Sequence, residues 1–123
     1  MNMNFNELEW HDAELLDIYI DRSMAGNNDI VKLTIKQPND IKVIAVFTDC
    51  YALNLNMNFG MIVLESILDA NILTESKELS KIRNVWGKMG VNLEKLKCFE
   101  IETNSTNSLI QIFALNYEIV KIK

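Results

Sequence analysis

Apolar and polar residues alternate with a period of two in short segments along the chain. Because successive side chains of a strand point to opposite faces, this alternation predicts an antiparallel sheet with one apolar and one solvated face. The expected fold class is α+β, in one domain spanning residues 1–123, with a largely antiparallel sheet of about seven to eight strands. We expect these strands in residues 16–21, 31–36, 41–47, 53–57, 97–103, 109–115 and 117–123, with one more ending near Leu73.

The first two segments predict a hairpin, because the turn-forming residues 24–29 (MAGNND) separate them. On the polar face of this hairpin, Lys32 or Lys36 is expected to lie across from Asp17 or Asp21, where opposite charges attract. Residues 41–47 (IKVIAVF) predict a central strand that is buried on both faces. The side chains of the hairpin expected to point into the core are Leu16, Ile18, Ile20, Val31, Leu33 and Ile35.

A different spacing marks residues 76–89, where apolar residues recur every three or four positions. This spacing predicts an amphipathic helix packed on the apolar face of the sheet, with Ser76 as its N-cap and Gly90 as its terminator. Residues 61–73 fit either a helix or a strand, and we favour the strand. The apolar residues of the expected helix are Leu79, Ile82, Val85, Trp86 and Met89.

Negative charge is concentrated near the start of the chain. Residues 1–50 hold nine acidic and four basic residues, whereas residues 51–123 hold eight of each. An acidic stretch repels phosphate backbones and anionic lipids and favours a basic protein partner, so the pattern argues against nucleic-acid and membrane binding. The polar face of Asn54, Asn56 and Asn58 is a further candidate, although a solvated face is its simpler interpretation. The acidic residues expected to bind a partner are Glu7, Glu9, Asp12, Glu14, Asp17 and Asp21.

His11 is the only histidine and stands next to Asp12, a pair that also occurs in metal-dependent phosphohydrolases. Those sites need several histidine and aspartate ligands, because one imidazole and one carboxylate do not hold a catalytic divalent ion tightly. A metal site that adds Glu14 still lacks a second histidine. We therefore expect no metal, no cofactor and no catalytic residue. Instead, His11 and Asp12 are expected to donate and accept hydrogen bonds that fix the entry into the first strand, with Trp10 anchoring the chain in the core.

The first ten residues carry neither a positive charge nor an apolar run, unlike a signal or transit peptide. Apolar segments long enough to span a bilayer are also missing. These features predict a cytoplasmic protein. In reducing surroundings, Cys50 and Cys98 are expected to be free, unreactive thiols in apolar strands, since a disulfide between them would not persist there.

Four segments carry a family resemblance: WHDAELLDIYIDR (10–22), VFTDCYALNLNMNFG (46–60), the helix with Trp86, and IETNSTNSLIQIFALNYEIV (101–120). Together they resemble a group of small bacterial proteins that open with a Trp-His-Asp strand. Some members of that group are similar to immunity proteins of polymorphic toxin systems. The resemblance implies a cytoplasmic, non-enzymatic protein that protects its producer by binding a cognate toxin. The acidic residues favour a basic toxin domain as that partner.

Two other functions remain open at this point. One is a small enzyme or ligand-binding domain, which requires a polar pocket around His11 and Asp12. The other is a self-associating module, in which an exposed edge such as residues 117–123 pairs with a second copy.

Overall fold

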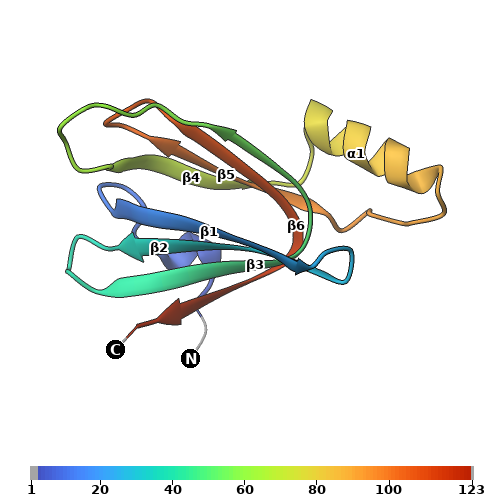
Figure 1. Cartoon of the computed structure of the whole chain (residues 1–123), viewed down its shortest axis with the longest axis horizontal. Coiled ribbons are helices and arrows are strands. Elements are labelled where there is room, and N and C mark those ends of the chain that lie inside the picture. The colour runs from blue at the N-terminus through green and yellow to red at the C-terminus, as the bar shows by residue number, and fades with distance from the viewer. Residues whose placement is uncertain (1–2, 123) are drawn as a thin grey trace.

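A computed structural model describes residues 3–122, in which six strands form one antiparallel sheet and one α-helix lies at its end (Figure 1). The order of strands across the sheet is β1-β2-β3-β6-β5-β4. The α+β class and the antiparallel sheet are therefore confirmed. The elements are η1 (Phe5–Glu7), β1 (Glu14–Met24), β2 (Asn28–Lys36), β3 (Lys42–Asn56), β4 (Ile67–Leu73), α1 (Lys77–Gly87), β5 (Lys97–Thr103) and β6 (Leu109–Lys121).

The expected number of strands was wrong, because two pairs of segments are each one long strand. The expected strands 41–47 and 53–57 are both parts of β3, which runs from Lys42 to Asn56. The expected strands 109–115 and 117–123 are both parts of β6, which runs from Leu109 to Lys121. The polar residues between the apolar segments stay in the sheet: Thr48 pairs with Asn116 and Cys50 with Ala114. The register then shifts between Cys50 and Ala52, as in a β-bulge, which bends a strand without ending it.

These bends roll the sheet into two layers, with β3 and β6 passing from one layer to the other (Figure 1). The two edge strands, β1 and β4, meet only where each begins. There the Leu15 N–H donates to the Glu65 carbonyl at 2.8 Å, and the Ile67 N–H donates to the Ala13 carbonyl at 2.8 Å. Pairing between β5 and β6 ends at Ala114, so residues 117–121 pair only with β3 and leave the expected edge open, apart from the Met3 N–H, which donates to the Ile119 carbonyl at 3.4 Å. Lys123 lies outside the described residues.

The core between the layers is built around aromatic side chains. Phe5 of η1 is fully buried, and its ring centroid lies 4.7 Å from that of Trp10 and 5.5 Å from that of Phe99. The Trp10 indole N–H donates to the Phe5 carbonyl at 2.7 Å, and the Phe5 N–H donates to the Tyr117 hydroxyl at 2.9 Å. The N-terminal segment is thus part of the core, and the expected anchoring role of Trp10 is confirmed.

The predicted helix is confirmed, including both of its ends. The Leu79 N–H donates to the Ser76 hydroxyl at 3.1 Å, and Gly90 follows the helix with a φ of +84°. Such a left-handed residue after the last turn is typical of glycine and stops the helix. α1 covers part of the outer face of the sheet. A second, smaller hydrophobic cluster forms there, and its buried residues are Leu79, Leu93, Leu96, Cys98 and Phe113.

The predicted faces of the first strands are only partly correct. Val31, Leu33 and Ile35 are buried as expected. A register shift between Leu15 and Asp17 places Leu15 in the core and leaves Leu16 44% exposed, so the expectation for Leu16 was wrong. The hairpin is confirmed, but Lys32 lies opposite Tyr19 and Lys36 opposite Glu14, not opposite Asp17 or Asp21.

Two further expectations need correction. The central strand is buried on one face only, because Val43, Ala45 and Phe47 are buried whereas Ile44 and Val46 are half-buried on the outer face. In residues 61–73, the favoured strand ending at Leu73 is confirmed as β4, but it begins only at Ile67, and residues 61–65 form a loop. Within residues 3–122, no helix combines the length and the apolarity that crossing a membrane requires.

Candidate binding cleft

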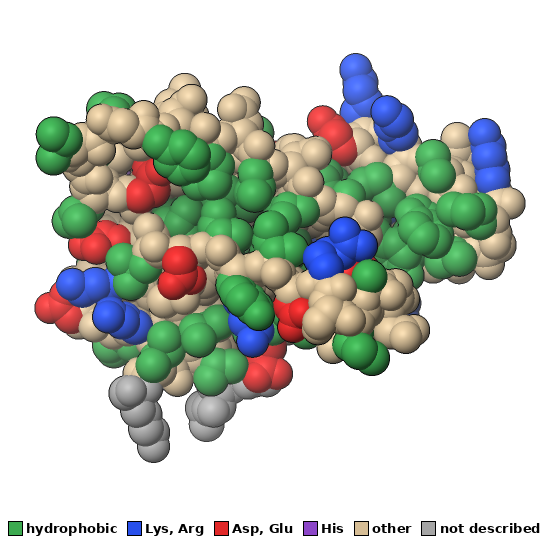
Figure 2. Space-filling model, in the orientation of Figure 1, with side chains coloured by type: hydrophobic (Ala, Val, Ile, Leu, Met, Phe, Trp, Pro, Cys, Tyr) green, Lys and Arg blue, Asp and Glu red, His purple; other side chains and the backbone are tan. Residues whose placement is uncertain are grey.

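An apolar cleft of about 480 Å³ lies between β1 and the second half of β3. Figure 2 shows hydrophobic side chains gathered in a hollow between the two layers of the sheet. Two of the lining side chains, Ile20 and Leu55, are 45% and 41% exposed although each lies on the inner face of its strand. The apolar residues that line the cleft are Leu15, Leu16, Ile18, Ile20, Leu55, Met57, Phe59, Met61 and Val63.

The cleft exists because β2 follows β3 only as far as Phe47. Beyond Phe47, β3 bends with β6 into the other layer, and the hairpin of β1 and β2 does not follow it (Figure 1). The inner faces of β1 and of residues 53–57 therefore face each other without a strand between them. An apolar surface left open in this way is typical of a protein interaction site.

A strongly exposed apolar loop forms one side of the cleft. Exposed contiguous apolar residues are uncommon on proteins that act alone, because they favour association with other surfaces. In this loop Phe59 is 85% exposed and Ile62 is fully exposed, and Met61, Val63 and Leu64 are each more than half exposed. We call residues 59–64 the apolar loop.

The turn between β5 and β6 holds the apolar loop at both ends. At one end the Asn58 N–H donates to the Ser108 hydroxyl at 3.0 Å. At the other end the Ser105 hydroxyl donates to the Leu64 carbonyl at 2.6 Å and accepts from the Ser66 N–H at 3.1 Å. The expected turn at residues 104–108 is confirmed, and its hydroxyl groups also position the loop beside the cleft.

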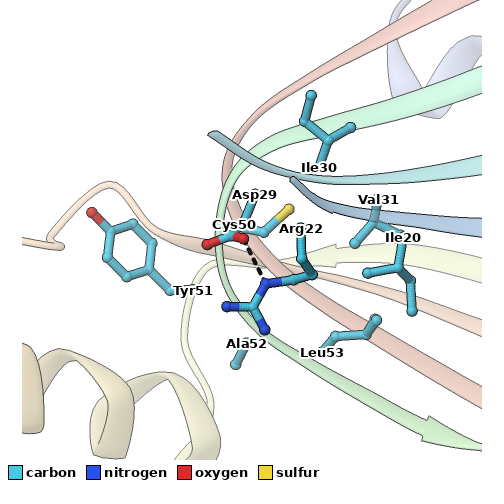
Figure 3. A pocket seen from close by; sticks show the side chains of 9 residues that line it. All are labelled: Ile20, Arg22, Asp29, Ile30, Val31, Cys50, Tyr51, Ala52 and Leu53. Carbon is cyan, nitrogen blue, oxygen red and sulfur yellow. Dashed lines mark hydrogen bonds and ion pairs between the residues drawn. The ribbon is translucent and has the colours of Figure 1, made fainter. Parts of the chain in front are cut away.

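A smaller pocket of about 160 Å³ continues the cleft toward the helix and shares Ile20 with it. Figure 3 shows Ile20, Val31 and Leu53 on one side of this pocket and Cys50 beside an ion pair on the other. In that pair, Arg22 Nε lies 2.7 Å from Asp29 Oδ1. A hydrogen bond from the Gly26 N–H, together with the bond from Arg22, lowers the pKa of Asp29. The charges at this end of the cleft are therefore paired within the chain.

The charged residues that line the cleft itself are Asp17 and Glu65. Glu65 Oε2 accepts a hydrogen bond of 2.6 Å from the Thr106 hydroxyl. Glu65 Oε1 is buried and has no hydrogen-bond partner within the described residues. Buried carboxylate oxygens are normally paired, so this one requires an explanation.

The acidic residues expected to bind a partner do not form one continuous face. Glu7 and Glu9 lie in the exposed N-terminal segment, and Asp12 lies beside His11. The Asp21 carboxylate already accepts hydrogen bonds from the hydroxyl and the N–H of Ser23 in the same strand, and these bonds lower its pKa. Glu14, Asp17 and Asp21 share the outer face of β1, and Asp17 also lines the cleft.

The three asparagines expected to share a binding face have different surroundings. Asn54 and Asn56 lie on the outer face of β3, where the Asn54 amide donates to Gln111 Oε1 at 3.4 Å. Asn58 lies after the strand, and its side-chain amide donates to the Thr106 carbonyl at 2.9 Å. The structure thus brings Asn58 to the cleft and leaves Asn54 and Asn56 on the outer surface.

His11 and Asp12 lie on the surface, with side chains 70% and 68% exposed. His11 Nδ1 lies 2.9 Å from the Leu68 carbonyl oxygen and donates to it, and His11 Nε2 lies 3.6 Å from Asp12 Oδ2. These contacts join the segment before β1 to β4, as expected for a structural role. Among residues 3–122, no group of three histidine, cysteine, aspartate or glutamate side chains is placed to hold a metal ion.

We expect the pKa of His11 to lie above its ordinary value of 6.5, first because of the hydrogen bond to Leu68 and then because of the charge of Asp12. The folded state then favours the charged imidazole, so its stabilising effect is full at low pH and is lost as pH rises through the raised pKa. A titration followed by NMR measures the midpoint. Asp12→Asn is expected to lower the midpoint without returning it to 6.5, since the Leu68 bond remains.

Asp12→Asn suits this test because Asp12 has a φ of +66°, a conformation that asparagine also tolerates. A midpoint at or below 6.5 in the unchanged protein would contradict the inferred hydrogen bond.

The two cysteines are free thiols, Cys98 buried and Cys50 half-buried. Burial raises the pKa of Cys50 to about 11 and that of Cys98 to about 12. Since the thiolate is the reactive form, neither thiol is activated as a nucleophile at neutral pH.

Sequence reasoning missed the main features of this site. Residues 61–64 of the apolar loop lay in a segment that fitted either a helix or a strand, with the strand favoured, and Leu16 and Ile20 were taken as core residues. One signal was present: residues 61–64 (MIVL) form an unbroken apolar run directly after Gly60, without the alternation of the neighbouring segments. Comparison with models of protein families, with curated proteins and with solved structures finds no match.

Proposed function

We propose that this chain is a non-enzymatic binding protein of the immunity type, which neutralises a cognate toxin by holding it in the apolar cleft. One observation carries the proposal: an open apolar cleft stands beside an exposed apolar loop that the fold itself fixes in place. The buried core of a protein interface is typically apolar, and these two adjacent apolar surfaces are suited to form such a core.

The acidic residues support the second part of the proposal, that the toxin domain is basic. Asp17 stands at the cleft, and Glu7, Glu9 and Asp12 are exposed in the segment that leads to it. Charges around an apolar centre raise the rate of association with an oppositely charged partner. In this proposal, contacts in the cleft supply most of the affinity for the toxin, and the acidic residues orient the toxin as it approaches.

The proposal is tested with the toxin domain encoded beside this gene in its native genome. The protein is co-produced with that domain in a growth assay, and the two purified proteins are titrated by calorimetry. Restored growth and a one-to-one complex are expected. A flanking region without a toxin gene, or a toxin domain that does not bind, would refute the immunity assignment.

We expect Leu16→Glu and Ile62→Glu each to weaken binding at least about tenfold, because each places a charge in the apolar centre of the interface. Both side chains are largely exposed in the free protein, so the free energy of unfolding is expected to change little.

Val120→Glu is the matched control for these variants. Val120 is an apolar strand residue with 38% exposure, and it lies on the outer face of β6, opposite Ile44. If Val120→Glu weakens binding as much as Leu16→Glu does, the contact surface is not the cleft.

A further inference from the structure

The unpaired oxygen of Glu65 is explained by the hydrogen bonds around it. The Ser108 hydroxyl accepts from the Asn58 N–H and lies 2.7 Å from the Thr106 hydroxyl. The Thr106 hydroxyl donates its single hydrogen to Glu65 Oε2, so the hydrogen between the two hydroxyls belongs to Ser108. Both hydroxyl hydrogens are therefore in use, and neither is left for Glu65 Oε1.

This chain of hydrogen bonds also fixes the position of the carboxylate. Asn58, Ser108 and Thr106 form an ordered path that ends on Glu65 Oε2. Oε1 is covered in the free chain, so a donor from a partner reaches it only when the atoms that cover it move aside. A cationic donor forms the strongest hydrogen bond with such an oxygen.

Resting on the function proposed above, we infer that the cleft takes a partner segment with apolar side chains and one lysine or arginine, whose cationic group pairs with Glu65. Charge complementarity supports this occupant. Asp17 and Glu65 both line the cleft, whereas among residues 3–122 no lysine, arginine or histidine lines it. A neutral apolar segment leaves Glu65 Oε1 unpaired in a more completely buried site, which is unfavourable.

A second copy of this chain fits the cleft less well. Its exposed apolar segment is the apolar loop, FGMIVL, which contains no lysine or arginine. Insertion of that loop would cover the apolar walls of the cleft without supplying a cation to pair with Glu65. A lipid chain lacks the cation as well, so the complementary charge favours a protein segment.

The test uses a phage-displayed library of random nonapeptides, selected on the immobilised full chain and counter-selected on Leu16→Glu. Each enriched peptide is then made in two forms, with lysine and with norleucine at the position where cations are enriched. We expect the norleucine peptide to bind the unchanged protein about tenfold more weakly than the lysine peptide does. On Glu65→Gln the two peptides are expected to differ by less than about twofold. The four affinities form a double-mutant cycle for the lysine and Glu65. Glu102→Gln, an exposed carboxylate on β5, is the control and is expected to behave like the unchanged protein.

The outcomes separate the inference from the proposed function. Enriched apolar peptides without a cation, or an equal norleucine effect in Glu65→Gln, would overturn the pairing with Glu65 and leave the apolar cleft intact. A library that yields no peptide sensitive to Leu16→Glu would overturn the cleft as a binding site. A dimer in light scattering that Ile62→Glu dissociates would assign the cleft to a second copy and overturn the inferred occupant.

Salt dependence provides a second measurement in case Glu65→Gln does not fold. Added salt is expected to weaken binding of the lysine peptide more than that of the norleucine peptide, because salt screens the ion pair alone. Equal salt dependence of the two peptides would contradict the inferred ion pair.

Discussion

Phe5→Ala is expected to lower the free energy of unfolding by about 3–5 kcal/mol, because it leaves a cavity at the centre of the core. The Phe5 ring is fully buried and lies against the rings of Trp10, Phe99 and Tyr117. A loss of this size is a large part of the about 5–15 kcal/mol that stabilises a typical domain. Urea unfolding followed by tryptophan fluorescence measures the change.

Phe59→Ala is the matched control, since it makes the same chemical change at a ring that is 85% exposed. Its effect on the free energy of unfolding is expected to stay within about 0.5 kcal/mol. A small effect of Phe5→Ala would show that the N-terminal segment is dispensable for folding, contrary to its place in the core.

Arg83→Met is expected to lower the free energy of unfolding by about 2–4 kcal/mol, because it removes several hydrogen bonds from a charged group. The Arg83 side chain is only 20% exposed. It joins the helix to the segments on both sides of it, donating to the carbonyls of Thr74 at 2.9 Å, Leu93 at 3.1 Å and Leu96 at 2.8 Å. Methionine keeps the apolar stem and removes every donor.

Arg22→Met tests whether loss of an arginine donor has this effect at any position. Arg22 is 68% exposed and pairs with Asp29, and the expected loss is below about 1 kcal/mol, as for most surface pairs. Hydrogen exchange at Leu96 adds a local measurement, since its N–H donates to the Leu93 carbonyl. Unchanged exchange at Leu96 in Arg83→Met would contradict the stabilising role of the hydrogen bonds that Arg83 donates.

The predictions that depend on neighbouring residues along the chain were the successful ones. The helix was recognised with its N-cap Ser76 and its terminator Gly90, because capping is a local interaction. The predicted buried face of β2 was also correct. Its pairing with β3 is regular, and the extra residues at the register shifts with β1 lie in β1, so the alternation of β2 is not interrupted.

The failures came from features that depend on distant parts of the chain. The bulge near Leu16 and the bend after Phe47 are set by how strands pair, and neither interrupts the sequence pattern in a visible way. The predicted strand ended at Phe47, although pairing with β6 keeps the following residues inside the same strand. The cleft results from this divergence of strands, so composition and alternation alone did not predict it.

The turn that holds the apolar loop has a consequence for variation between related chains. Its hydrogen bonds reach Leu64 and Ser66 through backbone groups and Asn58 through both its N–H and its side-chain amide, and those described use no side chain from residues 59–63. Substitutions in residues 59–63 therefore leave the anchorage unchanged. The sequence of the loop tip can therefore vary while the scaffold that presents it stays the same.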